Sequence, residues 1–271
     1  MLKTRVITAL VLLAVFLPVT LFAPIGGFGA LIAFVLIFAA WEWARLLKLS
    51  RNGTLAYAAL AALALVASMH VLSTSETSFY KASAVFWVIG APYILLRKPT
   101  LIERAWRGML LVVGVILLIA CWYALVSARI LGVPFVLTLL LVVWFADIGA
   151  YFAGKAFGRH KLALSISPGK TWEGAFGGWL LVMALAVAAI VSGACAPTLF
   201  SRLAGQMGWW RALIAVSILV VFSVVGDLFE SLLKRQAGVK DSSGLLPGHG
   251  GVLDRIDALL PVLPLAMLLL G

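Results

Sequence analysis

The sequence predicts an all-α, polytopic integral membrane protein, a helical bundle with about nine transmembrane helices and a cytoplasmic N-terminus. Of its 271 residues, 64% are hydrophobic and only 11% are charged, whereas soluble domains are close to half apolar. The mean hydropathy is +1.14. The apolar residues also form long uncharged runs, and a membrane span needs about 20 of them. The alternating pattern of a membrane β-barrel is absent from the sequence.

The predicted spans follow these runs along the chain. They are 6–23, 28–47, 54–73, 82–96, 108–127, 131–153, 173–193, 211–233 and 258–270. Proline and glycine mark several joints between the spans, as is usual for turns. These joints are Pro24 to Gly27, Asn52–Gly53, Lys98–Pro99 and Gly132 to Pro134.

The first and last runs need separate arguments. Residues 6–23 follow two basic residues, as a signal peptide would, but they lack a clear small-x-small cleavage site and a second apolar run comes next. We therefore expect a retained helix. Residues 258–270 are short and contain two prolines, so we expect this segment to be tilted, kinked or only partly spanning.

The net charge of +11 fits a membrane protein without a nucleic-acid partner. Lys and Arg gather in cytoplasmic loops and set the orientation. With nine spans and the N-terminus inside, 17 of the 21 Lys and Arg residues lie in cytoplasmic segments. A shift by one span inverts this bias, so the charges favour an odd number of spans. The same loops would contact anionic membrane lipid.

We expect one membrane domain, 1–271, with a scaffold-like half (1–130, spans one to five) and a catalytic half (131–271, spans six to nine). Seven of the ten acidic residues lie between positions 147 and 257, and charge at membrane depth is costly and usually functional. In the first half, Glu42 lies between two tryptophans and three residues before Arg45. This pattern favours an interfacial aromatic belt with a local ion pair.

The acidic residues of the second half concentrate at 226–257. Asp227, Glu230 and Lys234 share one helix face, and Asp254 and Asp257 share another at the same i, i+3 spacing. Carboxylates from two elements are the ligands that Mg²⁺ takes together with water and substrate phosphates. A solvated loop that only sets topology would explain the cations here but not the acids, which contribute little to orientation.

Cations and glycines in the same block suggest a polyphosphate ligand. The cations are Lys234, Arg235, Lys240 and Arg255, and the glycines are Gly244, Gly248, Gly250 and Gly251. Cationic side chains neutralise phosphates, and glycine lets a backbone approach a ligand closely. His249, between these glycines, would bind phosphate or donate a proton, and the sequence leaves this choice open.

A second cluster precedes the seventh span, at Ser165 to Gly174. A Walker-type phosphate loop is rejected, because position 164 is Leu where glycine is needed and no strand is expected before it. Ser167, Lys170 and Thr171 would still favour an anion at a helix entrance. Glu173 has an equal claim to be a simple N-terminal capping acid.

A third cluster lies inside the sixth span. Asp147 and Tyr151 are four residues apart, and an Asp within an apolar span favours a functional contact. Small residues around them permit close helix packing. They are Gly149, Ala150, Ala153 and Gly154.

The block at 231–257 resembles the signature of the phosphatidate cytidylyltransferases, also called CDP-diacylglycerol synthases. Every defined position matches over 27 residues: Ser231-x2-Lys234-Arg235-x4-Lys240-Asp241-x-Ser243-x2-Leu246-Pro247-x-His249-Gly250-Gly251-Val252-x-Asp254-Arg255-Ile256-Asp257. Ser167 to Gly174 and Asp147-x2-Ala150-Tyr151 resemble further family segments in the same order. The first half carries no diagnostic motif.

The resemblance implies that CTP and phosphatidate react to give CDP-diacylglycerol and pyrophosphate. It implies Mg²⁺, with K⁺ as a candidate second cation, a homodimer, and a site on the inner side of a bacterial cytoplasmic membrane that phosphatidate reaches from the inner leaflet. Asp227 and Asp254 would be the chief metal ligands, with Asp257 a weaker candidate. The expected catalytic residues are Asp227, Asp254, Lys234, Lys240, His249 and Arg255. The expected substrate-binding residues are Ser167, Lys170, Thr171, Asp147, Arg235, Asp241, Gly250 and Gly251.

Two other functions remain as alternatives. A CTP-dependent polyprenol or phytol kinase would transfer the γ-phosphate instead of CMP. A cation-coupled transporter would also place carboxylates in spans, but it predicts charges near the midplane and symmetry between halves, whereas these charges cluster at one end of one half.

Overall fold

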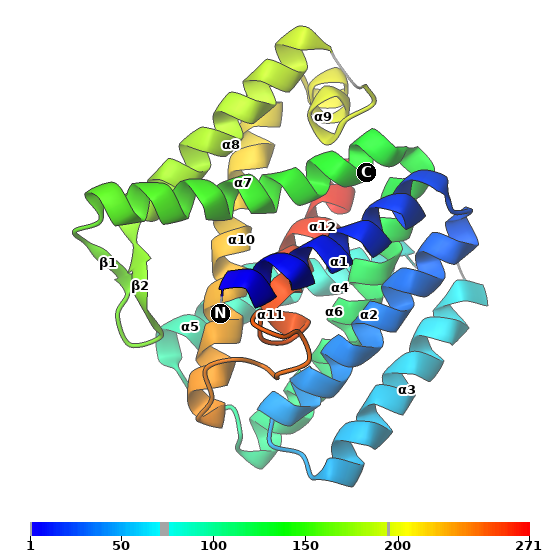
Figure 1. Ribbon diagram of the computed structural model, residues 1–271, viewed down its shortest axis with the longest axis vertical. Helices are drawn as coiled ribbons and strands as arrows, with labels where there is room; N and C mark the ends of the chain where they lie inside the picture. Colours follow the sequence, from blue (N-terminus) through cyan, green and yellow to red (C-terminus); the bar gives the residue numbers. More distant parts are fainter. Residues whose placement is uncertain (1, 71–75, 194–195) are drawn as a thin grey trace.

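The computed structural model describes residues 2–70, 76–193 and 196–271, and these form a bundle of helices with one small hairpin (Figure 1). The elements are α1 (Leu2–Phe22), α2 (Ile25–Leu46), α3 (Arg51–His70), α4 (Glu76–Val85), η1 (Phe86–Gly90, a π-helical turn), α5 (Ala91–Arg97), α6 (Arg104–Leu131), α7 (Val133–Phe157), β1 (Lys161–Ala163), β2 (Ser167–Thr171), α8 (Trp172–Ser192), α9 (Leu199–Met207), α10 (Trp209–Ala237), α11 (Leu253–Ile256) and α12 (Leu259–Leu269).

Within the described residues, seven helices are long and apolar enough to cross a membrane. They are α2, α3, the continuous α4–η1–α5, α6, α7, α8 and α10. The predicted all-α, polytopic membrane fold is therefore confirmed. The count of nine spans and the cytoplasmic N-terminus remain predictions, and residues 71–73 of the expected third span lie outside the described residues.

The expected ninth span is a short internal helix. α12 has 11 residues, which at 1.5 Å per residue span about 16 Å, against a hydrocarbon core of about 30 Å. Its residues from Leu259 to Ala266 are all buried, and it packs against α4, α6, α7 and α10. α12 is thus too short to cross the hydrocarbon core by itself, and it fills the centre of the bundle.

Most predicted joints are confirmed, with one shifted. Pro24 caps the start of α2, and Gly132, at φ 136°, separates α6 from α7. Lys98 ends α5 in the left-handed region, at φ 48°. The Asn52–Gly53 joint was wrong, because α3 begins at Arg51 and the chain leaves α2 through Lys48, at φ 54°.

The expectation that no strand precedes Leu164 was wrong, because β1 ends at Ala163. β1 and β2 form an antiparallel hairpin in which Lys161 pairs with Thr171 and Ala163 with Ser167. Contacts from other elements hold this hairpin. Lys98 Nζ donates to Ser165 Oγ at 2.6 Å, and Arg235 Nε donates to the Ile166 carbonyl at 3.1 Å. The 199–207 segment, which was expected to be a connection, forms α9.

A cluster of aromatic rings packs against the C-terminal half of α10. Phe229 stacks on Trp43 of α2, with centroids 6.0 Å apart. Phe86 and Trp87, consecutive residues of the π-helical turn, both meet Phe229 edge-on, at 5.3 and 5.7 Å. This packing fixes the turn of α10 that carries Asp227 and Glu230.

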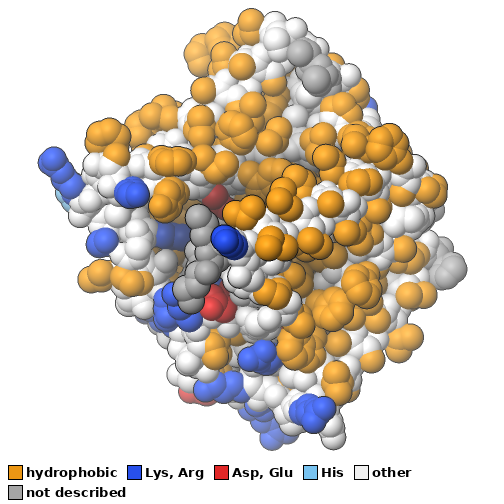
Figure 2. All heavy atoms as spheres, viewed as in Figure 1, with side chains coloured by type: hydrophobic (Ala, Val, Ile, Leu, Met, Phe, Trp, Pro, Cys, Tyr) orange, Lys and Arg blue, Asp and Glu red, His pale blue; other side chains and the backbone are white. Residues whose placement is uncertain are grey.

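Basic side chains gather at one end of the bundle. Figure 2 shows them along the left and lower edges of this face, over the hairpin and the end of α2, while the upper and right parts are hydrophobic. The hairpin and the end of α2 belong to segments that the sequence predicts to be cytoplasmic, and their orientation in the membrane remains a prediction.

We predict that the hairpin and α9 face opposite sides of the membrane, because α8 separates them (Figure 1). In a cysteine-free background, Lys161→Cys should react with an impermeant maleimide only from the cytoplasmic side, and Gly205→Cys only from the outside. Both positions are exposed. Labelling of both from one side would contradict the topology.

Candidate active site

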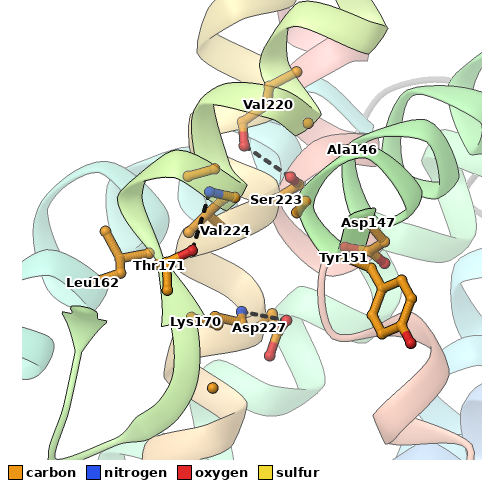
Figure 3. Close-up of a pocket in the computed structure, with 15 residues that line it drawn as sticks. Ala146, Asp147, Tyr151, Leu162, Lys170, Thr171, Val220, Ser223, Val224 and Asp227 are labelled. Carbon is orange, nitrogen blue, oxygen red and sulfur yellow. Dashed lines mark hydrogen bonds and ion pairs between the residues drawn. The ribbon is translucent and has the colours of Figure 1, made fainter. Parts of the chain in front are cut away.

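A cavity of about 250 Å³ lies between α7, β2, α8 and α10 (Figure 3). Asp147, Lys170 and Asp227 line its charged end, where Lys170 and Asp227 form an ion pair. The remaining wall is made largely of small or apolar residues. These include Ala146, Ala150, Ala175, Gly178, Val220 and Val224. The cavity therefore joins a charged end to an apolar slot between membrane helices.

Close packing of α7 on α8 brings β2 to this cavity. A Cβ at Gly149 would lie 2.8 Å from the Gly177 carbonyl oxygen and 2.8 Å from Gly178 Cα, so only glycine allows this approach. The packing predicted for the small residues of α7 is confirmed. It places Lys170, at the end of the hairpin, opposite Asp227 of α10.

Asp254 anchors the loop between α10 and α11. Its side chain is only 5% exposed, and both carboxylate oxygens accept hydrogen bonds. Oδ1 accepts from Lys234 Nζ at 2.6 Å. Oδ2 accepts from Ser242 N and Oγ, each at 2.9 Å, and from Gly251 N at 2.7 Å. Burial opposes ionisation, but the bonds from Lys234 and Gly251 outweigh it and lower the pKa of Asp254.

Lys234 joins α10 to the same loop. Its ammonium group forms ion pairs with Asp254 and with Glu230, one turn back on α10. The side chain is 14% exposed. Glu230 and Lys234 therefore share a face of α10, as predicted, and Lys234 pairs with carboxylates of the protein itself.

Glu42 is the residue of the site that the sequence analysis missed. The expected surface ion pair with Arg45 was wrong, because Glu42 is fully buried and Arg45 instead lies over the Trp41 ring, 5.4 Å from its centroid. The Glu42 carboxylate reaches across to the 242–253 segment. It accepts from Ser242 Oγ (3.1 Å), Ser243 Oγ, Val252 N (3.0 Å) and Leu253 N (2.6 Å).

The two glycines after His249 allow the loop to pack closely against Asp254 and Glu42. Gly250 has φ +82°, which favours glycine, and a Cβ there would lie 2.6 Å from Asp254 Oδ2. A Cβ at Gly251 would collide with Ser242 and Glu42. The N–H groups of His249 and Gly251 bond to Leu246 and Asp254. The backbone expected to cradle phosphates is therefore partly engaged within the loop.

Several other predicted residues hold neighbouring segments. Thr171 caps α8 by accepting from Gly174 N at 3.1 Å. Arg235 binds the hairpin, as described above, and Arg255 Nε donates to the His249 carbonyl at 3.1 Å. Glu173 accepts from the backbone N–H groups of Arg159 and His160 and pairs with the His160 ring, so it ties α8 to the connection before β1.

The remaining predicted residues lie around the site without such contacts. Lys240 and Asp241 are exposed on the loop, and Ser167 is half-buried in β2. Nδ1 of His249 is buried and has no hydrogen-bond partner among the described residues. Its choice between phosphate binding and proton donation stays open.

The acidic residues fit a metal ion only if substrate oxygens complete its shell. In the described chain, no three His, Cys, Asp or Glu side chains are placed to hold a metal by themselves. Burial, followed by repulsion from Asp227, raises the pKa of Asp257 to about 8. The Asp257 backbone lies against Gly226, the residue before Asp227: a Cβ at Gly226 would lie 2.5 Å from the Asp257 carbonyl oxygen. Glu230 Oε1 is buried with no donor from the described residues. Asp254 accepts four hydrogen bonds. Asp227 pairs with Lys170 and accepts from Ser231, and Asp257 accepts from Ala258 N. Asp227 and Asp257 are thus less heavily engaged and suit a divalent cation better than Asp254.

We predict that Glu42→Ala and Glu42→Gln both loosen the 238–252 loop. Alanine leaves buried donors unpaired, at about 1–3 kcal/mol each, and a glutamine NH₂ group would face donors where an acceptor is needed. Trypsin cleavage after Lys240 should accelerate at least tenfold in both variants. Glu103→Ala, at an exposed glutamate, is the control. Equal cleavage rates in all three would contradict the anchoring role.

Comparison with known proteins identifies the family. The model of the cytidylyltransferase family matches residues 3–271. The phosphatidate cytidylyltransferase of Pseudomonas aeruginosa is 40% identical over 274 residues, which cover 100% of this chain and 97% of that protein. Proteins of the same name from Brucella suis and Staphylococcus epidermidis are 35% and 33% identical, over 95% and 99% of this chain and 89% and 98% of their own lengths. The chain therefore belongs to the cytidylyltransferase family.

Proposed function

We propose that this protein is a phosphatidate cytidylyltransferase, which transfers CMP from CTP to phosphatidate and releases pyrophosphate. The observation that carries the proposal is the cavity in which Lys170 and Asp227 meet an apolar slot between α7, α8 and α10. Family membership supports it, because the relatives that match along the whole chain bear this name.

The cavity suits a lipid phosphate in particular. A phosphate at the charged end would contact the Lys170 ammonium, and the glycerol backbone would lie against small side chains such as Ala150 and Val224. The acyl chains would remain in the bilayer, because the slot lies between helices that are apolar enough to span it. CTP would approach from water at the basic end of the bundle, where Lys240 and Arg255 are exposed.

The proposed reaction needs little acid–base chemistry from the protein. A phosphatidate oxygen, already anionic, attacks the α-phosphorus of CTP and forms a new P–O bond. The bond to the bridging oxygen of the β-phosphate breaks, and pyrophosphate leaves with the electron pair. The main barriers are charge repulsion and in-line alignment. Lys170, Lys240 and Arg255 would reduce the repulsion, and the anchored loop would hold Arg255 in position.

Mg²⁺ is part of the proposal, with Asp227 and Asp257 as the residues that would hold it. When bound, the ion would neutralise phosphate oxygens and the developing charge on the leaving group. Glu230, Lys234 and Asp254 would position the loop next to it. K⁺ as a second cation would depend on further oxygens from the substrates.

The setting of the reaction follows from charge. We propose that the protein lies in a bacterial cytoplasmic membrane with the site on the cytoplasmic side. The basic turns lie at the same end of the bundle as the site, and Lys and Arg gather in cytoplasmic segments. Phosphatidate would enter from the inner leaflet. The homodimer implied by the resemblance is also a proposal, and light scattering of the purified protein in detergent measures it.

The position of the radiolabel separates the proposed reaction from its nearest rival. Purified protein with phosphatidate, Mg²⁺ and α-labelled CTP should place label in the lipid product, and γ-labelled CTP should not. A lipid kinase acting on polyprenol or phytol gives the reverse pattern. Label from γ-labelled CTP alone would refute cytidylyl transfer.

Removal of one charge from the central ion pair should cost much activity. Asp227→Asn and Lys170→Ala should each lower kcat/KM by about 10²–10³, as expected when one group that stabilises transition-state charge is lost. Lys161→Ala, at an exposed lysine on the same hairpin, is the matched control and should stay within twofold of wild type. Membrane insertion is checked by extraction and gel filtration. Near-normal rates in the Asp227 and Lys170 variants would remove this cavity from the mechanism.

A further inference from the structure

A second and larger cavity, of about 660 Å³, lies between α2 and α3 and shares no lining residue with the cavity described above. Its apolar walls include Ile37 and Phe38 of α2 and Leu55 and Ala58 of α3. Phe38 is 36% and Leu55 56% exposed, so the groove opens to the surroundings of the bundle. In a membrane these surroundings are lipid.

One end of this groove is cationic. Arg45 and Arg51 line it, and both are exposed. Arg45 lies over the Trp41 ring, which also lines the groove. Neither guanidinium forms an ion pair with any residue that the structure describes. Two unpaired guanidiniums above an apolar groove match an anionic phosphate with hydrocarbon chains.

The groove also contacts the loop of the candidate active site. Leu245 lines it and is 41% exposed. The Leu245 N–H donates to Ser243 Oγ at 3.1 Å, and Ser243 donates in turn to Glu42. Two neighbouring residues of α2 therefore face different partners. Trp41 lines the groove, and Glu42 holds the loop.

We propose that this groove binds one anionic phospholipid and that the bound lipid restrains the 238–252 loop through Leu245. The lipid phosphate lies between Arg45 and Arg51, and an acyl chain follows Phe38 and Leu55. The occupant is a lipid rather than free phosphate, because most of the groove is apolar. A zwitterionic headgroup would bring a second positive charge to the two arginines, so the site prefers an anionic one.

The binding arm of the test uses native mass spectrometry on the purified full-length protein, titrated with phosphatidylglycerol or phosphatidylcholine. Wild type should retain phosphatidylglycerol preferentially, and Arg45→Ala/Arg51→Ala should weaken its retention on the order of tenfold. Lys48→Ala is the matched control, because Lys48 is exposed on the same turn and does not line the groove. Equal weakening by the control, or no lipid preference, would overturn the proposal. Loss of a dimer in the double variant would assign the groove to a second copy of the chain and overturn it as well.

The coupling arm measures trypsin cleavage after Lys240 in the same samples. Phosphatidylglycerol should slow cleavage at least threefold in wild type and have no such effect in Leu245→Ala, which should still retain the lipid. Equal protection in both would show that Leu245 does not transmit binding. Neither arm uses catalysis, so both hold whatever the outcome of the cytidylyl-transfer assay.

Discussion

The Glu42 carboxylate on α2 accepts two hydroxyl and two backbone hydrogen bonds from a segment some 200 residues later in the chain. Burial of a carboxylate is costly unless its oxygens are satisfied, and here four donors satisfy them. The consequence reaches across the molecule, because Ser242 contacts both Glu42 and Asp254. Its hydroxyl shares one hydrogen between the two carboxylates, and its backbone N–H donates to Asp254. Asp254 in turn holds Lys234, and Lys234 holds Glu230. One chain of charged and hydroxyl groups thus links α2, the loop, α11 and α10.

This network divides the charges of the site into two kinds. Glu42, Asp254 and Lys234 have their polar atoms engaged by other residues and are largely buried, so they fix geometry. Asp227 and Lys170 are more exposed, at 29% and 26% of their side chains, and face the cavity. Such groups can exchange their mutual ion pair for contacts with a substrate phosphate or a cation. The buried network around Glu42 therefore positions the cavity residues Asp227 and Lys170.

Seven of the predicted spans correspond to helices of the described residues that are long and apolar enough to cross a membrane, because hydropathy over about 20 residues is a strong signal. Glycine and proline, as at Gly132, mark the turns between them. α12 was harder, since an apolar run does not reveal whether protein or lipid surrounds it. Glu42 was assigned to Arg45 because sequence spacing shows local partners only, and its true partners are brought near by folding. The prediction of Asp254 as a metal ligand also rested on spacing along the chain. Its spacing from Asp257 was visible, but the donors from Ser242, Gly251 and Lys234 were not. The hairpin was missed because three-residue and five-residue strands depend on contacts such as that of Arg235.

The central claim is that Asp227 and Asp257 bind the cation while Asp254 holds the loop. It is tested most directly by counting bound Mn²⁺ by electron paramagnetic resonance, in the presence of CTP, for Asp227→Asn, Asp257→Asn and Asp254→Asn. The account predicts that the first two variants weaken Mn²⁺ binding at least tenfold, while folded Asp254→Asn protein keeps near-normal affinity and shows a loosened loop to trypsin. Loss of Mn²⁺ binding in Asp254→Asn together with normal binding in Asp257→Asn would contradict it.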